Sequence, residues 1–143
     1  ALADYTMFIG SGALWGETIL FSMCILEEMQ WKRTRYITSA DFFHGTLELV
    51  EPGVPVFLFM GEDENRKLDE RVRAFLTRGV TGDTDINVID TAEFAIPGLD
   101  DEFRVIVSPW ILSSLITDRL AAYYETVTKH NLNYRRYYHQ FDY

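Results

Sequence analysis

The chain has 143 residues, of which 48% are hydrophobic and 15% are aromatic. This length supports one well-filled core and is too short for two ordinary domains, so we expect one compact domain. The net charge of -9 disfavours a nucleic-acid or anionic-membrane partner, since either would need a basic surface. The single cysteine, Cys24, excludes a disulfide framework and a CxxC metal pattern and is typical of the reducing cytoplasm.

Short apolar runs alternate with longer helical patterns along the chain. This alternation predicts an α/β fold, a three-layer sandwich with a mostly parallel sheet. The predicted strands are residues 6–9, 35–38, 54–60 and 86–89. The predicted helices are residues 13–29, 41–50, 65–78 and 110–129. Residues 103–107, which precede Ser108-Pro109, fit either a fifth strand or the start of a helix.

Three segments suggest that the chain is part of a larger protein or assembly. Residues 1–4 lead at once into a predicted strand, which indicates a fragment or a processed piece of a longer protein. The predicted helix 13–29 is apolar nearly all round, so we expect burial against the sheet and against a second body, such as another domain or subunit. The tail, residues 130–143, is aromatic and basic, and we expect it to pack on a neighbouring domain or subunit.

Basic residues are few but they cluster. Lys32, Arg33 and Arg35 form one group, and Arg135 and Arg136 form another. Such groups hold a small anion at one spot or are solvated loop charges, and the pattern does not decide between these alternatives.

A glycine-rich segment, Gly10-Ser11-Gly12-Ala13-Leu14-Trp15-Gly16, joins the first strand to the first helix. Backbone amides at a helix start bind phosphate or carboxylate groups. The spacing is GxGxxxG rather than GxGxxG, so a dinucleotide site is only weakly indicated. The alternative is a tight turn that needs glycine for backbone reasons alone.

A carboxylate and an imidazole are the strongest candidates for chemistry. Glu28 closes the first helix, and His44 follows sixteen residues later, in Asp41-Phe42-Phe43-His44-Gly45. Together such groups move protons to and from carbon and oxygen near neutral pH. Helical periodicity leans towards Glu28 over Glu27 without settling which one faces a site. The alternatives are surface glutamates at a helix end and an ordinary, partly buried histidine.

Other kinds of site find little support in the sequence. No HxxxH or HExxH spacing occurs, so no metal site is predicted. The nucleophile elbow GxSxG of serine hydrolases is also missing. No run of about 18 uninterrupted apolar residues is present, so no membrane partner is predicted.

Three segments read together carry a resemblance. Phe8-Ile9-Gly10-Ser11-Gly12, Ile25-Leu26-Glu27-Glu28-Met29 and Ser39-Ala40-Asp41-Phe42-Phe43-His44-Gly45 resemble the sugar isomerase (SIS) domain family. Their order is similar to the second SIS half of the isomerase part of glucosamine-6-phosphate synthase. Within the family, the whole chain looks like the carboxyl-terminal half of a fructosamine 6-phosphate deglycase.

This resemblance implies a fold and a set of site residues. Residues 1–129 would form an SIS domain of flavodoxin-like, doubly wound type, the second of two halves. Glu28 and His44 would be catalytic, Ser11 would contact the sugar phosphate, and no cofactor would be needed. The site would be shared between the subunits of a homodimer. The synthases carry a Schiff-base lysine near the position of Gln140, which argues against their mechanism here.

The implied activity is cleavage of a 6-phosphorylated fructosamine, an Amadori compound such as 6-phosphofructose-aspartate or -lysine. The products would be glucose 6-phosphate and an amino acid. Two alternatives stay open: a binding module that senses a sugar phosphate, and a phosphosugar aldose-ketose isomerase. A dinucleotide-dependent oxidoreductase is the least favoured interpretation.

Overall fold

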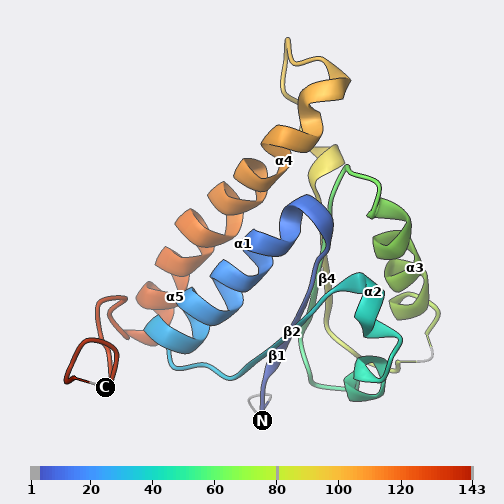
Figure 1. Ribbon diagram of the computed structural model, residues 1–143. Helices are drawn as coiled ribbons and strands as arrows, with labels where there is room; N and C mark the ends of the chain where they lie inside the picture. The colour runs from blue at the N-terminus through green and yellow to red at the C-terminus, as the bar shows by residue number, and fades with distance from the viewer. Residues whose placement is uncertain (1–3, 80, 143) are drawn as a thin grey trace.

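A computed structural model describes residues 4–79 and 81–142 and contains one parallel four-stranded sheet in the order β2-β1-β3-β4 (Figure 1). The strands are β1 (Thr6–Ile9), β2 (Thr34–Ile37), β3 (Val56–Met60) and β4 (Ile86–Asp90). All three strand pairs are parallel. The predicted α/β sandwich is confirmed, and each strand lies within two residues of its predicted bounds. Residues 1–3, on which the fragment prediction partly rests, and residue 143 of the tail lie outside the described residues.

Helices cover both faces of the sheet (Figure 1). One face is covered by the segment after β1, which comprises η1 (Gly12–Leu14), α1 (Trp15–Ile19) and η2 (Leu20–Met29). The same face carries a long helix built from η5 (Asp101–Phe103), α4 (Arg104–Ser113), η6 (Ser114–Leu120) and α5 (Ala121–Thr128). The other face carries α2 (Ser39–Phe42), followed by η3 (Thr46–Leu49), and α3 (Arg66–Leu76). A short turn, η4 (Thr91–Glu93), follows β4.

Burial on both faces explains why the strands are apolar without alternation. Phe8 and Phe59 point to the face under α1 and the long helix, where they join the first buried cluster. Met7, Ile9 and Leu58 point to the opposite face and pack in a second cluster with the helices α2 and α3. All five side chains are fully buried.

The second body that covers the predicted helix 13–29 belongs to the same chain. Phe21 and Ile25 of η2 share a buried cluster with Leu112 of α4 and Ile116 of η6. This helix is not uniform, because a 3-10 turn leads into an α-helical turn and then into a wider π-helix. A π-helix changes the angle between successive side chains, so the usual helical period does not tell which residues share a face.

The predicted helix 41–50 is wrong. The α-helix stops at Phe42, and the chain turns at Gly45, where φ is 141°, before the short 3-10 helix η3. A φ in this region favours glycine because it has no Cβ. His44 therefore lies in a turn between two short helices rather than on a continuous helix.

Residues 103–107 belong to the long helix, which settles the alternative that the sequence left open. Pro109 lies inside α4, where proline lacks the N–H that would bond the carbonyl four residues earlier. The hydroxyl of Ser108 donates to that carbonyl, the oxygen of Val105, at 3.1 Å. A neighbouring side chain thus satisfies the group that proline leaves unpaired, and the helix continues.

The long helix also carries an exposed apolar surface. Ile106, Trp110, Tyr123 and Val127 are 68%, 77%, 66% and 80% exposed, respectively. By length and composition, Asp101–Thr128 would be able to cross a membrane, although the same test is passed by helices of soluble proteins. The predicted absence of a membrane partner therefore stays a prediction.

A buried carboxylate ties the carboxyl ends of the strands together. Asp69 of α3 is 1% exposed and accepts hydrogen bonds from the Ser39 hydroxyl at 2.5 Å and from the Gly61 amide at 3.2 Å. The Ser39 amide in turn donates to the hydroxyl oxygen of Ser11 at 2.8 Å. Burial raises the pKa of Asp69 to about 6, and the two hydrogen bonds oppose this rise only in part.

The raised pKa of Asp69 predicts a pH dependence of stability. Between about pH 4 and pH 6 the folded state binds more protons than the unfolded state, so the free energy of unfolding falls as pH rises through this window. Urea unfolding of wild type and Asp69→Asn at pH 4.5 and pH 7 measures this effect. Relative to the variant, the wild type should lose about 2 kcal/mol over this range.

The exposed substitution Asp83→Asn serves as the control, because it removes a carboxylate without changing a buried group. The free energy of unfolding of Asp83→Asn should depend on pH as that of the wild type does. If Asp69→Asn also showed this same pH dependence, a raised pKa at Asp69 would be wrong.

Candidate active site

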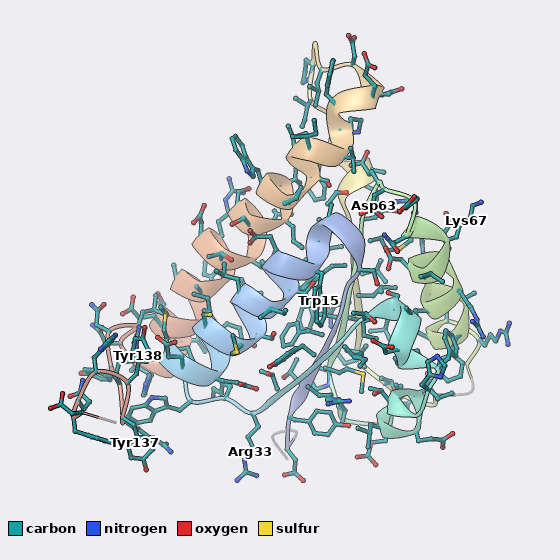
Figure 2. The ribbon with its side chains drawn as sticks, in the orientation of Figure 1. Trp15, Arg33, Asp63, Lys67, Tyr137 and Tyr138 are labelled. Atoms are coloured by element: carbon teal, nitrogen blue, oxygen red, sulfur yellow. The ribbon has the colours of Figure 1, made fainter. Side chains whose placement is uncertain are left out.

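A pocket of about 540 Å³ lies between the end of η2 and the C-terminal tail. Figure 2 shows Tyr137 and Tyr138 of the tail next to the end of this helix. The pocket is lined by charged and aromatic side chains from the helix end, the loop before β2 and the tail: Glu27, Glu28, Trp31, Lys32, Arg33, Arg135, Arg136, Tyr137 and Tyr138. Its volume falls in the usual range for a small-molecule site.

Glu28 is held by an arginine of the tail. Arg135 Nε donates to Glu28 Oε1 at 2.8 Å, and the two side chains are 16% and 29% exposed, respectively. The same guanidinium donates to the carbonyl oxygens of Leu132 at 2.7 Å and Tyr134 at 2.9 Å. Because these carbonyls fix the guanidinium, it fixes the Glu28 carboxylate in turn, while part of that carboxylate stays open to solvent.

Glu27 has a different partner. Its Oε1 accepts a hydrogen bond from the Thr34 hydroxyl at 2.5 Å, at the start of β2. Glu27 is thus bound to the sheet, whereas Glu28 is bound to the tail. The structure separates two neighbouring glutamates, between which sequence periodicity leaned towards Glu28 without settling the choice.

The tail packs on the helix end of its own chain. Gln30 is 3% exposed, donates to the carbonyl oxygen of His130 at 2.7 Å and accepts from the Thr128 hydroxyl at 2.9 Å. Trp31 has a φ of 54°, and its ring lies 4.3 Å from the ring of His130 and 4.1 Å from the Arg136 guanidinium carbon. Whether the tail also packs on a neighbouring domain or subunit stays a prediction.

His44 lies on the other side of the sheet. It is exposed, and its amide donates to the carbonyl oxygen of Asp41 at 2.9 Å. The helix just before it is anchored by Phe42, which packs in the cluster on the face opposite η2. Within one chain the structure therefore does not bring His44 and Glu28 together.

Ser11 lies at the opposite edge of the sheet from Glu28. It is 4% exposed, and its hydroxyl oxygen accepts the Ser39 amide. Close by, Asp63 Oδ2 accepts the Ala13 amide at 2.5 Å, and a Cβ on Gly12 would lie 2.0 Å from this carboxylate oxygen. The helix start thus already faces an anion of its own chain. The role of Ser11 as a phosphate ligand stays a prediction.

The sequence indicated two clusters of basic residues but did not show that residues of both clusters line the same pocket. Lys32 and Arg33 line the same pocket as Arg135 and Arg136, whereas Arg35 donates to Thr46 at 3.2 Å instead. The clusters lie about a hundred positions apart along the chain, so only the folded tail reveals that they share a site. Among the described residues, no group of three or more histidine, cysteine or acidic side chains forms a metal cage.

Comparison with known proteins finds similar sequences among deglycases. No family model matches. The chain is 33% identical over 136 residues to the fructosamine deglycase FrlB of Bacillus subtilis, covering 93% of the chain and 39% of that protein. It is 36% identical over 116 residues to the fructoselysine 6-phosphate deglycase of Escherichia coli, covering 79% of the chain and 31% of that enzyme.

A solved structure supports the same relationship. A candidate phosphosugar isomerase from Bacillus subtilis superposes with a TM-score of 0.86 at 28% identity, over 98% of this chain and 42% of that one. The chain thus spans about two fifths or less of the length of the proteins that it matches. The chain is therefore an SIS-domain protein that resembles the carboxyl-terminal half of the fructosamine 6-phosphate deglycases.

Proposed function

We propose that this chain is the catalytic half of a deglycase that cleaves a 6-phosphorylated fructosamine into glucose 6-phosphate and an amino acid. One observation carries the proposal: a fixed but solvent-accessible carboxylate, Glu28, lines a pocket of small-molecule size in a chain similar to fructosamine deglycases. The pocket supplies what the reaction needs first, a base held beside room for a sugar.

In the proposed mechanism Glu28 acts on the open-chain form of the substrate. Its carboxylate removes a proton from C1, the carbon that bears the nitrogen, and the electrons move towards the C2 carbonyl to give an enaminol. Return of a proton to C2 leaves a double bond between C1 and nitrogen. Water then adds to this imine, and loss of the amine gives the aldehyde of glucose 6-phosphate and the free amino acid.

The ion pair with Arg135 supports this role through position. A base must lie within hydrogen-bond reach of the proton that it removes, so a freely rotating glutamate would spend most of its time misaligned. The guanidinium bonds Oε1 and leaves Oε2 of Glu28 available to the substrate.

We assign the second proton-transfer group to a second subunit. His44 lies across the sheet from Glu28 in its own chain, so His44 would have to reach the pocket from a neighbouring copy. In a twofold dimer this exchange is reciprocal and creates two equal sites. His44 of the partner would assist ring opening and proton transfer at the sugar oxygens.

The phosphate would be bound outside this chain. The helix start after Ser11 is occupied by the Asp63 carboxylate, and a second anion there would meet electrostatic repulsion. Since the relatives are more than twice as long, the additional half is the natural source of phosphate-binding loops. The isolated chain should therefore fold but turn over poorly.

A plain aldose-ketose isomerase remains the second candidate, because the similar solved structure is described as a candidate phosphosugar isomerase. Both activities share the proton transfer between C1 and C2. Only the products distinguish them, since an isomerase releases no amine.

Substitution of the base tests the proposal. In the full-length protein, Glu28→Gln should lower kcat at least about a hundredfold, because the amide cannot accept a proton. Production of glucose 6-phosphate and free amino acid from 6-phosphofructose-amino acids is followed by NMR. Glu102→Gln, an exposed change at the far end of the long helix, is the matched control. Near-normal turnover by a folded Glu28→Gln protein would rule out this base.

Mixing of inactive subunits tests the shared site. Glu28→Ala and His44→Ala proteins should each be inactive, and after subunit exchange the mixture should recover about a quarter of wild-type activity, because half of the dimers hold one intact site of two. Native mass spectrometry verifies that mixed dimers have formed. Mixed dimers without any activity would show that both residues act within one chain or that one of them is not catalytic.

A further inference from the structure

The pocket beside Glu28 holds more positive charge than proton transfer requires. Four cations line it, Lys32, Arg33, Arg135 and Arg136, against two carboxylates, Glu27 and Glu28. Arg135 is paired with Glu28, whereas Lys32, Arg33 and Arg136 form no ion pair within the described part of the chain. In a chain with a net charge of -9, a local excess of unpaired cations around one cavity attracts an anion.

Two of these cations are arginines from segments of the chain that are far apart in sequence. Arg33 lies in the loop before β2, and Arg136 lies in the tail. The Arg136 guanidinium carbon is 4.1 Å from the centre of the Trp31 ring. When a guanidinium stacks its flat face on an aromatic ring, its N–H edge stays free for a planar acceptor such as a carboxylate. Figure 2 shows Arg33, Tyr137 and Tyr138 along the same lower part of the molecule.

Building on the deglycase function above, we propose that this pocket is a subsite for the carboxylate of the amino acid that the substrate carries on its nitrogen. Arg33 and Arg136 are its ligands, and the aromatic rings of Trp31 and the tail tyrosines form its walls. The substrates are then Amadori phosphates of free amino acids, joined through the α-nitrogen. Amadori phosphates of amines or amides that lack this carboxylate are poor substrates.

The position of Glu28 favours the carboxylate over the phosphate as the bound anion. Glu28 acts at C1, and the α-carboxylate is separated from C1 only by the nitrogen and one carbon. The phosphate lies on C6, at the far end of the sugar. An anion site in the same pocket as the base thus lies on the amino-acid side of the substrate, and bidentate pairing with arginine suits a carboxylate.

Binding of non-cleavable analogues tests this subsite separately from turnover. Reduction of the C2 carbonyl to an alcohol prevents reaction, and three such analogues are compared by calorimetry with the full-length protein. These are the glycine compound with its 6-phosphate, the corresponding glycinamide compound, and the glycine compound without phosphate. Glycine and glycinamide have the same size and differ in charge, so their ratio of Kd values reports the carboxylate contact.

The wild type should bind the glycinamide analogue about tenfold more weakly than the glycine analogue, the usual effect of losing a charge-assisted hydrogen bond. Arg33→Gln and Arg136→Gln should each bring this ratio towards one. Arg73→Gln, an exposed arginine of α3 on the other side of the sheet, is the matched control and should keep the wild-type ratio.

Two results would overturn the subsite. One is a ratio near one in the wild type, and the other is a ratio that both arginine variants retain. A third result would also contradict the proposal. If the arginine substitutions weakened binding of the phosphorylated glycine analogue but not of the analogue without phosphate, these cations would bind the phosphate.

A product assay with the cleavable glycine and glycinamide compounds separates this proposal from the deglycase function. Glucose 6-phosphate formed equally well from both would remove the subsite and keep the deglycase. No glucose 6-phosphate from either, with a tenfold ratio of Kd values, would remove the deglycase and keep the subsite.

Discussion

The parallel direction of all four strands is the constraint on which the layout of the site depends. Each strand ends at the same edge of the sheet, and each following helix returns the chain to the other edge. Ser11, Ser39 and Gly61 consequently meet at the carboxyl edge, where Asp69 accepts hydrogen bonds from Ser39 and Gly61, and Ser39 donates to Ser11. Glu28, at the end of the returning helix, lies at the amino edge with the tail. Because all strands run in the same direction, the Asp69 hydrogen bonds lie at the carboxyl ends of the strands and the candidate catalytic Glu28 lies at their amino ends.

The tail completes the candidate site because charge is balanced there locally. Glu28 at a helix end faces the negative end of the helix dipole, and the Arg135 guanidinium compensates for it. The carbonyls of Leu132 and Tyr134 hold that guanidinium, so the geometry of the base depends on how the tail folds. Residues far outside the SIS-like motifs therefore position the residue that the motifs single out.

The sequence predicted the sheet better than the helices, and the reasons are physical. Buried parallel strands are plain apolar runs, which are easily recognised in residues 54–60. The wide π-helix around Glu27 and Glu28 has a different period, so an ordinary helical pattern leaned towards Glu28 without settling which glutamate contacts the tail. The turn at Gly45 interrupts what looked like one helix, since a single glycine does not show whether its φ is positive. The contact of Arg135 with Glu28 is long-range and leaves no local pattern.

Openness of the pocket bears on the choice between deglycation and isomerisation. Both reactions need the same proton transfer, but deglycation also needs water to reach an imine at C1. In the single chain, Glu28 is 29% exposed at the wall of its pocket, so solvent reaches this side chain. A site that served only isomerisation gains from excluding water, because water competes for reactive intermediates. Under the proposed function, the fixed base and the neighbouring cations, which form no ion pair among the described residues, would suit release of an amino acid better than rearrangement of the sugar alone.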